Sequence, residues 1–277
     1  MGMLVDAKKS ISKKKEQAVV DEVIRRLESA VHLKEQGKEA EGDMVVNDMI
    51  EWLDGIIQKI EKSTAPVEQP VVERSSLPQA GEKIAVGDKV ALAVIREEEK
   101  EKYLEVSYEY SYMKGAYKDE KFREITWKEF LSDSSFVCSI YDKESGDYVG
   151  YCSVKNLVKG DWELAIELKP EACHKGYGTE ALQLLMQALN RLTDRRYFRV
   201  RVEIDNNASQ GLMKKIGAIP NGISEFLLHG EEIENFQEDY KDMITDEIRE
   251  VAAEFCMEAE EMLGYVLEYR LDVERLK

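Results

Sequence analysis

The sequence feature that most constrains the fold is a junction at residues 162–192, where a short apolar strand runs through a glycine-containing loop into a long amphipathic helix. The loop contains Gly176-Tyr177-Gly178. Glycines let a backbone approach a ligand closely, and the unpaired N–H groups at a helix start favour phosphate or pyrophosphate. The Lys-Ser/Thr pair of a Walker loop and the third glycine of a dinucleotide-binding fingerprint are absent. The junction therefore predicts an α/β arrangement with a phosphate-binding loop of another type.

Composition narrows the class of protein further. Of 277 residues, 43% are hydrophobic and 34% charged, and no apolar run approaches the roughly 20 residues that cross a bilayer. The formal net charge of −17 argues against nucleic acid as a ligand. The four cysteines form no close pair and the three histidines are widely spaced, so neither a disulfide framework nor a metal site is expected. The N-terminus lacks the apolar segment of a secretory signal, which predicts a cytoplasmic protein with no membrane partner.

The first part of the chain is predicted to form a separate helical hairpin over residues 1–62, with a flexible linker over residues 63–83. Two apolar runs with helical spacing are separated near Gly37 and Gly42, and three of the five prolines fall in the linker. Such a hairpin must pack on something, so it is either a dimerisation or docking element or a cap on the main domain. Its apolar residues are Val20, Val23, Ile24, Leu27, Ala30 and Val31, then Val45, Met49, Ile50, Leu53, Ile56, Ile57 and Ile60.

Residues 84–277 are predicted to form one domain with a mixed α/β (α+β) sheet. The predicted strands cover 89–95, 136–142, 148–157, 162–168, 196–204, 223–229 and 264–273, and the predicted helices cover 97–113, 126–132, 178–192 and 209–217. An acidic helical insertion, about 229–262, precedes the last strand and carries 13 acidic against two basic residues. Its carboxylates could steer a cationic acceptor, or its apolar stripe could simply cover the sheet.

Three short motifs of this domain resemble the GNAT superfamily of N-acetyltransferases, within it the RimJ/RimL-like branch. Cys173-His174-Lys175-Gly176-Tyr177-Gly178 fits the family's phosphate loop, and Thr179-Glu180-Ala181-Leu182 fits its helix start. Asn206-Asn207-Ala208-Ser209 and Leu212-Met213-Lys214-Lys215-Ile216-Gly217 fit a later segment. The resemblance spans about 84–228 and 264–277. It implies a GNAT-like twisted mixed sheet and metal-free acetyl transfer from acetyl-CoA to a primary amine, by direct attack on the thioester. The amine would be a protein N-terminus, a polyamine or a small molecule.

The resemblance also implies roles for individual residues. Glu163 would be the general base, acting through water, with Glu167 on the same strand face as the alternative; Ser209 would be the general acid, because Met213 stands where many members carry a tyrosine. Other readings remain open: Glu163 as a partly buried carboxylate bonded to a neighbouring strand, Asn206 and Ser209 as helix caps, and the whole domain as a weakly active or inactive acyl-CoA-binding module. The coenzyme A contacts would be Ile166, Glu167, Leu168, His174, Lys175, Gly176, Tyr177, Gly178, Thr179, Asn206 and Ser209.

Overall fold

The computed structural model describes residues 20–64 and 72–276, with the side chains of 20–53 and 72–276. The chain divides into two compact units, Met1–Glu68 and Gln69–Lys277. The predictions for residues 1–19 and 65–71, and those for the side chains of Ile56, Ile57 and Ile60, lie outside the described residues.

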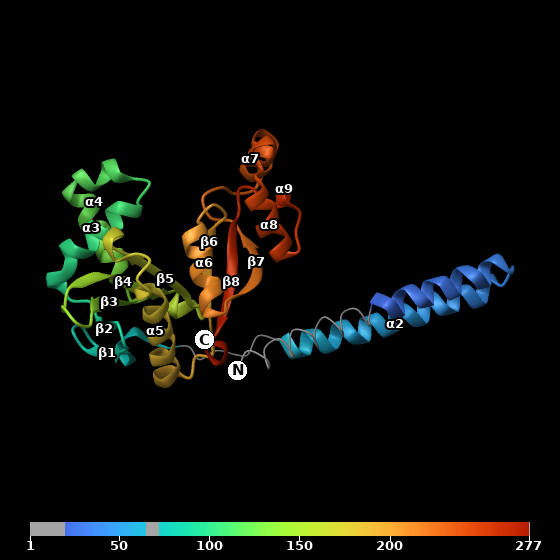
Figure 1. Cartoon of the computed structure of the whole chain (residues 1–277), viewed down its shortest axis with the longest axis horizontal. Helices are drawn as coiled ribbons and strands as arrows, with labels where there is room; N and C mark the ends of the chain where they lie inside the picture. Colours follow the sequence, from blue (N-terminus) through green and yellow to red (C-terminus); the bar gives the residue numbers. More distant parts are fainter. Residues whose placement is uncertain (1–19, 65–71, 277) are drawn as a thin grey trace. The chain divides into compact units, whose positions relative to one another are not determined.

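The first unit contains the predicted helical hairpin, formed by a helix over residues 20–35 and α2, Glu39–Thr64 (Figure 1). The chain reverses at Gly37, whose φ of 76° suits glycine. Gly42 does not mark the break, as the sequence suggested, but lies inside α2. A Cβ there would lie 3.0 Å from the carbonyl oxygen of Ala30, so Gly42 lets the two helices approach closely.

The second unit is built on a mixed sheet. Within the described residues this sheet has eight strands, in the order β1-β2-β3-β4-β5-β6-β8-β7. Neighbouring strands are antiparallel except β5 and β6, which are parallel. The strands are β1 Lys83–Val86, β2 Val90–Val94, β3 Phe136–Asp142, β4 Tyr148–Lys155, β5 Glu163–Leu168, β6 Tyr197–Glu203, β7 Ile219–Ser224 and β8 Val266–Asp272. The sheet and its helices confirm the predicted mixed α/β class.

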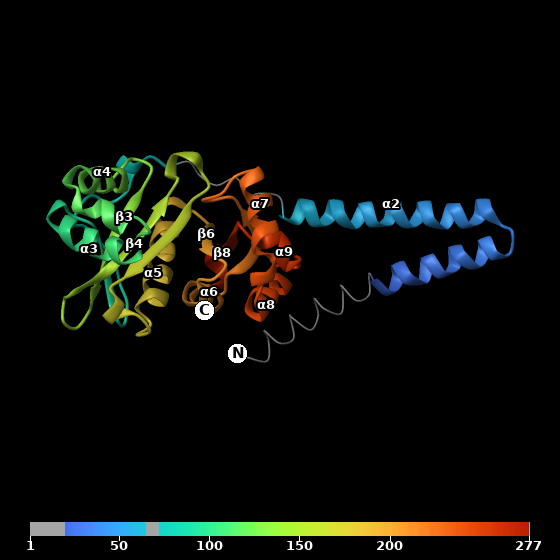
Figure 2. The same ribbon diagram turned by 90° about the horizontal axis from the view of Figure 1, so that it is seen from above.

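The parallel strands β5 and β6 part almost as soon as they meet. They share one register pair, Glu163 with Arg199, whereas β4 and β5 share six. Figure 2 shows β6 and β8 turning away from β3 and β4, with α5 alongside the sheet. One edge of β5 therefore opens toward its C-terminal end, directly before the glycine loop.

Helices cover both faces of the sheet. Successive side chains of a strand point to opposite faces, so neighbouring residues of β4 pack against different helices. Cys152 of β4 joins the main core with α5 (Tyr177–Thr193) and α6 (Asn207–Ile216). The adjacent Tyr151 joins an aromatic cluster with α3 (Lys100–Tyr110) and α4 (Glu120–Phe130). The apolar face of α5 consists of Ala181, Leu182, Leu185, Met186, Ala188 and Leu189, all buried.

The acidic insertion consists of three short helices: α7 Glu231–Tyr240, α8 Asp246–Phe255 and α9 Ala259–Met262. They lie at the β7 and β8 end of the sheet (Figure 1). Ile244, Val251 and Met262 are buried in the main core, so the insertion does cover this part of the molecule. Tyr240 and Met243, two further apolar residues of the insertion, are exposed.

Three local predictions need correction. The helix expected at 126–132 begins six residues earlier, because the Asp119 side chain accepts the Lys121 N–H at 2.8 Å and caps α4. The strand expected at 223–229 lies at Ile219–Ser224, where pairing with β8 tolerates an irregularity between Pro220 and Gly222. Strand β1 was missed altogether.

The second half of the expected linker also belongs to the folded unit. Leu77 is only 3% exposed and lies in the main core, and the Arg74 guanidinium lies 5.2 Å from the Phe136 ring centroid. The division between the two units falls at Glu68 and Gln69.

Candidate functional site

The glycine loop connects the end of β5 to the start of α5 through a short turn, Pro170–Ala172. His174 and Gly176 both have left-handed backbones, with φ of 61° and 85°, and Gly176 is the N-cap of α5. The first residues of a helix have N–H groups without intrahelical partners, and these carry the positive end of the helix dipole. The free N–H groups of the first turn of α5 therefore follow directly on the loop. The loop residues are His174, Lys175 and Gly176, and the first helical residues are Tyr177, Gly178 and Thr179.

Gly178 has a different role from Gly176. It is buried in the first turn of α5, and a Cβ there would lie 3.5–3.6 Å from side-chain carbons of Leu168, Ile166 and Leu212. That is ordinary van der Waals contact, so the position faces packed apolar side chains of β5 and α6. A methyl group fits there, whereas a charged side chain would have to be buried.

The loop is held against the tip of the β3–β4 hairpin. The Tyr177 hydroxyl donates a hydrogen bond to Asp142 Oδ2. This bond, followed by the N–H of Ser145, lowers the pKa of the Asp142 carboxyl, and the same bond raises the pKa of Tyr177. Beside this contact lies a cavity of about 460 Å³ lined by both lysines and carboxylates, among them Lys102, Lys169 and Asp147.

The open edge of β5 presents backbone groups from alternate residues. Lys169 N–H donates to the Val149 carbonyl of β4 at 2.9 Å, and antiparallel ladders alternate, so Glu167 also directs its backbone toward β4. Ile166 and Leu168 direct theirs to the side where β6 has parted. Of the three strand residues expected to contact coenzyme A, two therefore offer backbone groups at the opening.

Glu163 lies at the closed end of this opening and is engaged in ion pairs. Its Oε2 accepts Arg201 Nε at 2.9 Å and Arg199 Nη2 at 3.3 Å. Arg199 in turn contacts Asp161 at 3.1 Å and Glu268 at 3.2 Å. The carboxylate is a bridge between two guanidinium groups of β6, in line with the non-catalytic alternative for this residue.

Glu167 occupies a different environment on the same strand face. Its carboxylate is half-buried among aromatic rings and accepts a hydrogen bond from the Tyr151 hydroxyl. Burial raises the pKa of Glu167, while the bond from Tyr151 and the charge of Lys155 act in the opposite direction. The raised pKa values of four surrounding tyrosines, caused first by burial, include a contribution from the Glu167 charge: Tyr103, Tyr110, Tyr148 and Tyr151.

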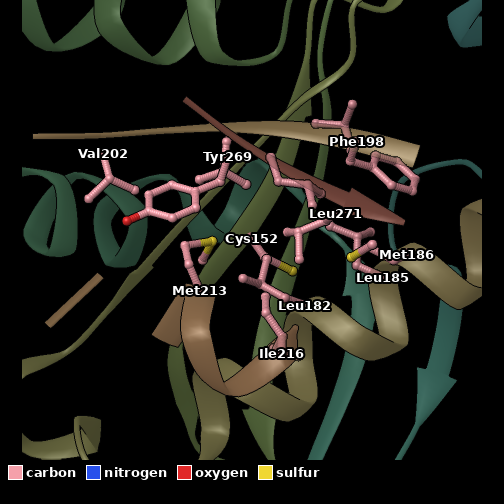
Figure 3. Close-up of a cluster of buried hydrophobic side chains, with 14 of the residues drawn as sticks. Cys152, Leu182, Leu185, Met186, Phe198, Val202, Met213, Ile216, Tyr269 and Leu271 are labelled. Atoms are coloured by element: carbon pink, nitrogen blue, oxygen red, sulfur yellow. The ribbon is translucent and has the colours of Figure 1, made fainter. Parts of the chain in front are cut away.

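At the start of α6, Asn206 is the N-cap: its Oδ1 accepts the Ser209 N–H at 3.0 Å. Ser209 is partly exposed in the first turn. Met213, one turn further, is 1% exposed and packs with Val202, Tyr269 and Ile216 (Figure 3). The position expected to hold a catalytic tyrosine in many relatives is therefore a core position in this chain.

Two tyrosines that the sequence analysis missed lie over the ends of β5 and β6. The Tyr110 hydroxyl donates to the Leu168 carbonyl at 2.6 Å, and the Tyr112 hydroxyl donates to Glu203 Oε2 at 2.6 Å. The bond to Glu203 raises the pKa of Tyr112 to about 12. The sequence does show a tyrosine at every second position at the end of α3, namely Tyr108, Tyr110 and Tyr112. Only the fold shows that two of them face the ends of β5 and β6.

Within the described part of the chain, no helix is both long and apolar enough to span a membrane. The same residues contain no group of three or more His, Cys, Asp or Glu side chains that could hold a metal ion.

Comparison with known proteins identifies a domain family for the central part of the chain. A family profile described as an acetyltransferase (GNAT) domain matches residues 86–219. No curated protein matches the chain. Two of the similar solved structures are an acetyltransferase of the GNAT family from Bacillus anthracis (15% identity) and RimL, a ribosomal L7/L12 α-N-protein acetyltransferase, in complex with coenzyme A (13% identity). Each covers 70% of this chain and 99% of its own length, with a TM-score of 0.49. Residues 86–219, just under half of the chain, are therefore identified as an acetyltransferase (GNAT) domain.

Proposed function

We propose that this acetyltransferase transfers the acetyl group of acetyl-CoA to a primary amine, in the manner of the RimJ/RimL-like branch, with Glu167 as the general base. The observation that carries the proposal is the position of Glu167 on β5 (Figure 1 labels this strand). It is a half-buried carboxylate with a raised pKa, on the strand whose other groups line the opening toward β6.

The residues present fit coenzyme A. The N–H groups from His174 to Thr179 surround the start of α5 and suit the pyrophosphate. Ile166 and Leu168 offer an unpaired strand edge to the amide groups of pantetheine. The Leu168 carbonyl accepts the Tyr110 hydroxyl with one lone pair, which leaves its second lone pair for a pantetheine N–H. Asn206 and Ser209 lie at the start of α6, which packs against α5.

The acceptor amine has to lose a proton before it reacts. An ordinary alkylamine with a pKa of about 10.4 is neutral only about once in 10³–10⁴ molecules at pH 7. The amine nitrogen bonds to the thioester carbon, the carbon–sulfur bond breaks, and the amine proton passes to Glu167. A carboxylate with a raised pKa is better matched to this task than one paired with two guanidinium groups, such as Glu163.

The departing sulfur requires little help. A thiol of pKa about 8.5 leaves as thiolate at pH 7 at a cost of about 2 kcal/mol. The Ser209 hydroxyl is the group we assign as general acid, since Met213 is buried and offers no proton. Catalysis rests otherwise on positioning of the two reactants.

The amine class is favoured by the surroundings of Glu167. Aromatic faces and a carboxylate together attract an ammonium group. A protein N-terminus, a polyamine and a small-molecule amine all present such a group, so the acceptor is defined here by its primary amine.

The test is the release of free thiol from acetyl-CoA on addition of a panel of primary amines. Glu167→Gln should lower kcat about 10²–10⁴-fold, the usual effect of losing a general base, with little change in the Kd for coenzyme A. Glu163→Gln is the matched control on the same strand face and should keep the parental pH–rate profile.

If Glu163→Gln alters that profile and Glu167→Gln does not, the two assignments are exchanged. If no amine on the panel releases thiol while acetyl-CoA raises the Tm, the chain is instead an acyl-CoA-binding module.

A further inference from the structure

The turn between β1 and β2, Gly87–Val90, contacts the first turn of α5 although 92 residues separate Asp88 from Glu180. The Glu180 carboxylate accepts three successive backbone N–H groups: Asp88 at 2.6 Å, Lys89 at 2.8 Å and Val90 at 2.8 Å. Hydrogen bonds to an ionised acceptor are stronger than neutral ones. One side chain at the start of α5 thus fixes the backbone of a remote turn.

The same turn makes a contact in the opposite direction. Lys89 Nζ donates to the Lys175 carbonyl at 2.8 Å. The peptide bond between Lys175 and Gly176 is trans, so its C=O and N–H point to opposite sides. An ammonium bound to this carbonyl polarises the peptide and keeps its N–H directed away from Lys89, among the donors of the loop.

Gly87 provides the space for this arrangement. A Cβ at Gly87 would lie 2.6 Å from both Cδ and Oε1 of Glu180, closer than real contacts allow. The turn is also attached on its other side, because Lys143 Nζ donates to the Gly87 carbonyl at 2.8 Å and Lys143 N–H donates to the Lys89 carbonyl at 2.9 Å. The turn therefore links the β3–β4 hairpin to the glycine loop.

We propose that the Gly87–Val90 turn is a brace that holds the glycine loop in its pyrophosphate-binding geometry, with Glu180 and Lys89 as positioning residues. The proposal rests on the proposed function, which assigns this loop to coenzyme A. In this proposal both side chains act through the backbone groups they bind, Glu180 on the turn and Lys89 on the Lys175 carbonyl. Loss of the brace should therefore weaken the binding of acyl donors that carry a pyrophosphate, and it should leave the rate of reaction at the thioester unchanged.

The experiment compares acetyl-CoA with S-acetylpantetheine, which has the thioester and the pantetheine arm but no pyrophosphate. Glu180→Gln replaces one acceptor oxygen with an NH₂ group, and Gly87→Ala displaces the carboxylate without changing any charge. Each should raise the Kd for coenzyme A and the KM for acetyl-CoA about tenfold, with kcat close to parental. Lys89→Met removes one exposed bond and should have about a threefold effect, which Lys89→Arg restores. Lys83→Met, an exposed lysine of β1, is the control.

The second readout is amide hydrogen exchange. In Glu180→Gln, exchange should accelerate at residues 88–90 and also in the loop at 174–178. Faster exchange confined to 88–90, or parental binding of coenzyme A by Glu180→Gln and Gly87→Ala, would overturn the brace. Equal losses with both donors would also overturn it, since they would indicate general damage. If the parent protein itself does not prefer acetyl-CoA over S-acetylpantetheine, the glycine loop does not bind the pyrophosphate. That result would contradict the proposed function, whereas the other outcomes contradict only the brace.

Discussion

Two glutamates on one face of β5 show how much a side chain's role depends on its neighbours. Glu163 meets two arginines of β6, while Glu167, beyond the point where β6 parts from β5, meets tyrosines. The strand pattern alone makes them equivalent. The cross-strand partners, which come from 36 and 38 residues further along the chain, distinguish them.

The raised pKa of Glu167 has a consequence for stability. A carboxyl whose pKa is higher in the folded state binds its proton more tightly there than in the unfolded chain. Stability therefore falls as pH rises from the unfolded pKa near 4.5 through the folded pKa, because the unfolded chain releases its proton first. Above the folded pKa, the full cost of the buried charge is present.

We predict that Glu167→Gln removes this pH-dependent cost. The Gln side-chain oxygen can still accept the Tyr151 hydroxyl, so the variant should equal or exceed the parent in unfolding free energy at neutral pH. The difference should shrink toward about pH 4, where the parent carboxyl is protonated. Urea unfolding of both proteins across this range provides the measurement. A constant difference at every pH would mean that Glu167 is not the group whose burial is costly.

The helices and strands that the sequence predicts correctly are those whose residue pattern is local. The path from β5 through the loop to α5 follows from an apolar strand, two glycines and a helical repeat, all within about thirty residues. The start of α4 was hidden because the residues after Asp119 are mostly charged. Strand β7 was misplaced because Pro220-Asn221-Gly222 is typical of a turn, and only pairing with β8 makes it a strand. The Glu180 contact lies outside any local pattern.

The insertion α7–α9 combines a structural and a proposed electrostatic role. Ile244, Val251 and Met262 anchor it in the core. Five carboxylates of α7 are exposed: Glu231, Glu232, Glu234, Glu238 and Asp239. Exposed charge of one sign attracts a charged ligand mainly by raising the association rate, and salt weakens the effect as the Debye length falls to about 8 Å at physiological ionic strength.

We predict that replacing these five carboxylates with their amides lowers kcat/KM for cationic amines several-fold at low salt, with no change for neutral amines. Raising the salt concentration should remove the difference between parent and variant. Steady-state kinetics with both amine classes is the measurement, and unchanged Tm serves as the control for the fold. If both classes respond equally, α7 only covers the sheet.

The hairpin lies outside the residues that match the acetyltransferase domain and belongs to a separate compact unit. Among the hydrophobic residues of the hairpin whose side chains are described, only Ala30 and Met49 are buried. Four others are about half exposed: Val20, Ile24, Leu27 and Val31. Their spacing of four, three and four residues is that of a coiled-coil seam. We propose that a second copy of the hairpin packs on this seam and forms a four-helix dimer.

We predict that residues 69–277 fold and bind coenzyme A without the hairpin, because the second unit has its own core, which reaches back to Leu77. Deletion has to stop at residue 68, since removal of Leu77 would open a cavity in that core. Light scattering should show a dimer for the full chain and a monomer for the deletion variant. The double variant Ile24→Glu and Leu27→Glu should also be monomeric, since a buried seam does not accommodate unpaired charges. A deletion variant that remains dimeric would place the interface in the acetyltransferase domain, and an insoluble one would mean that the hairpin completes its core.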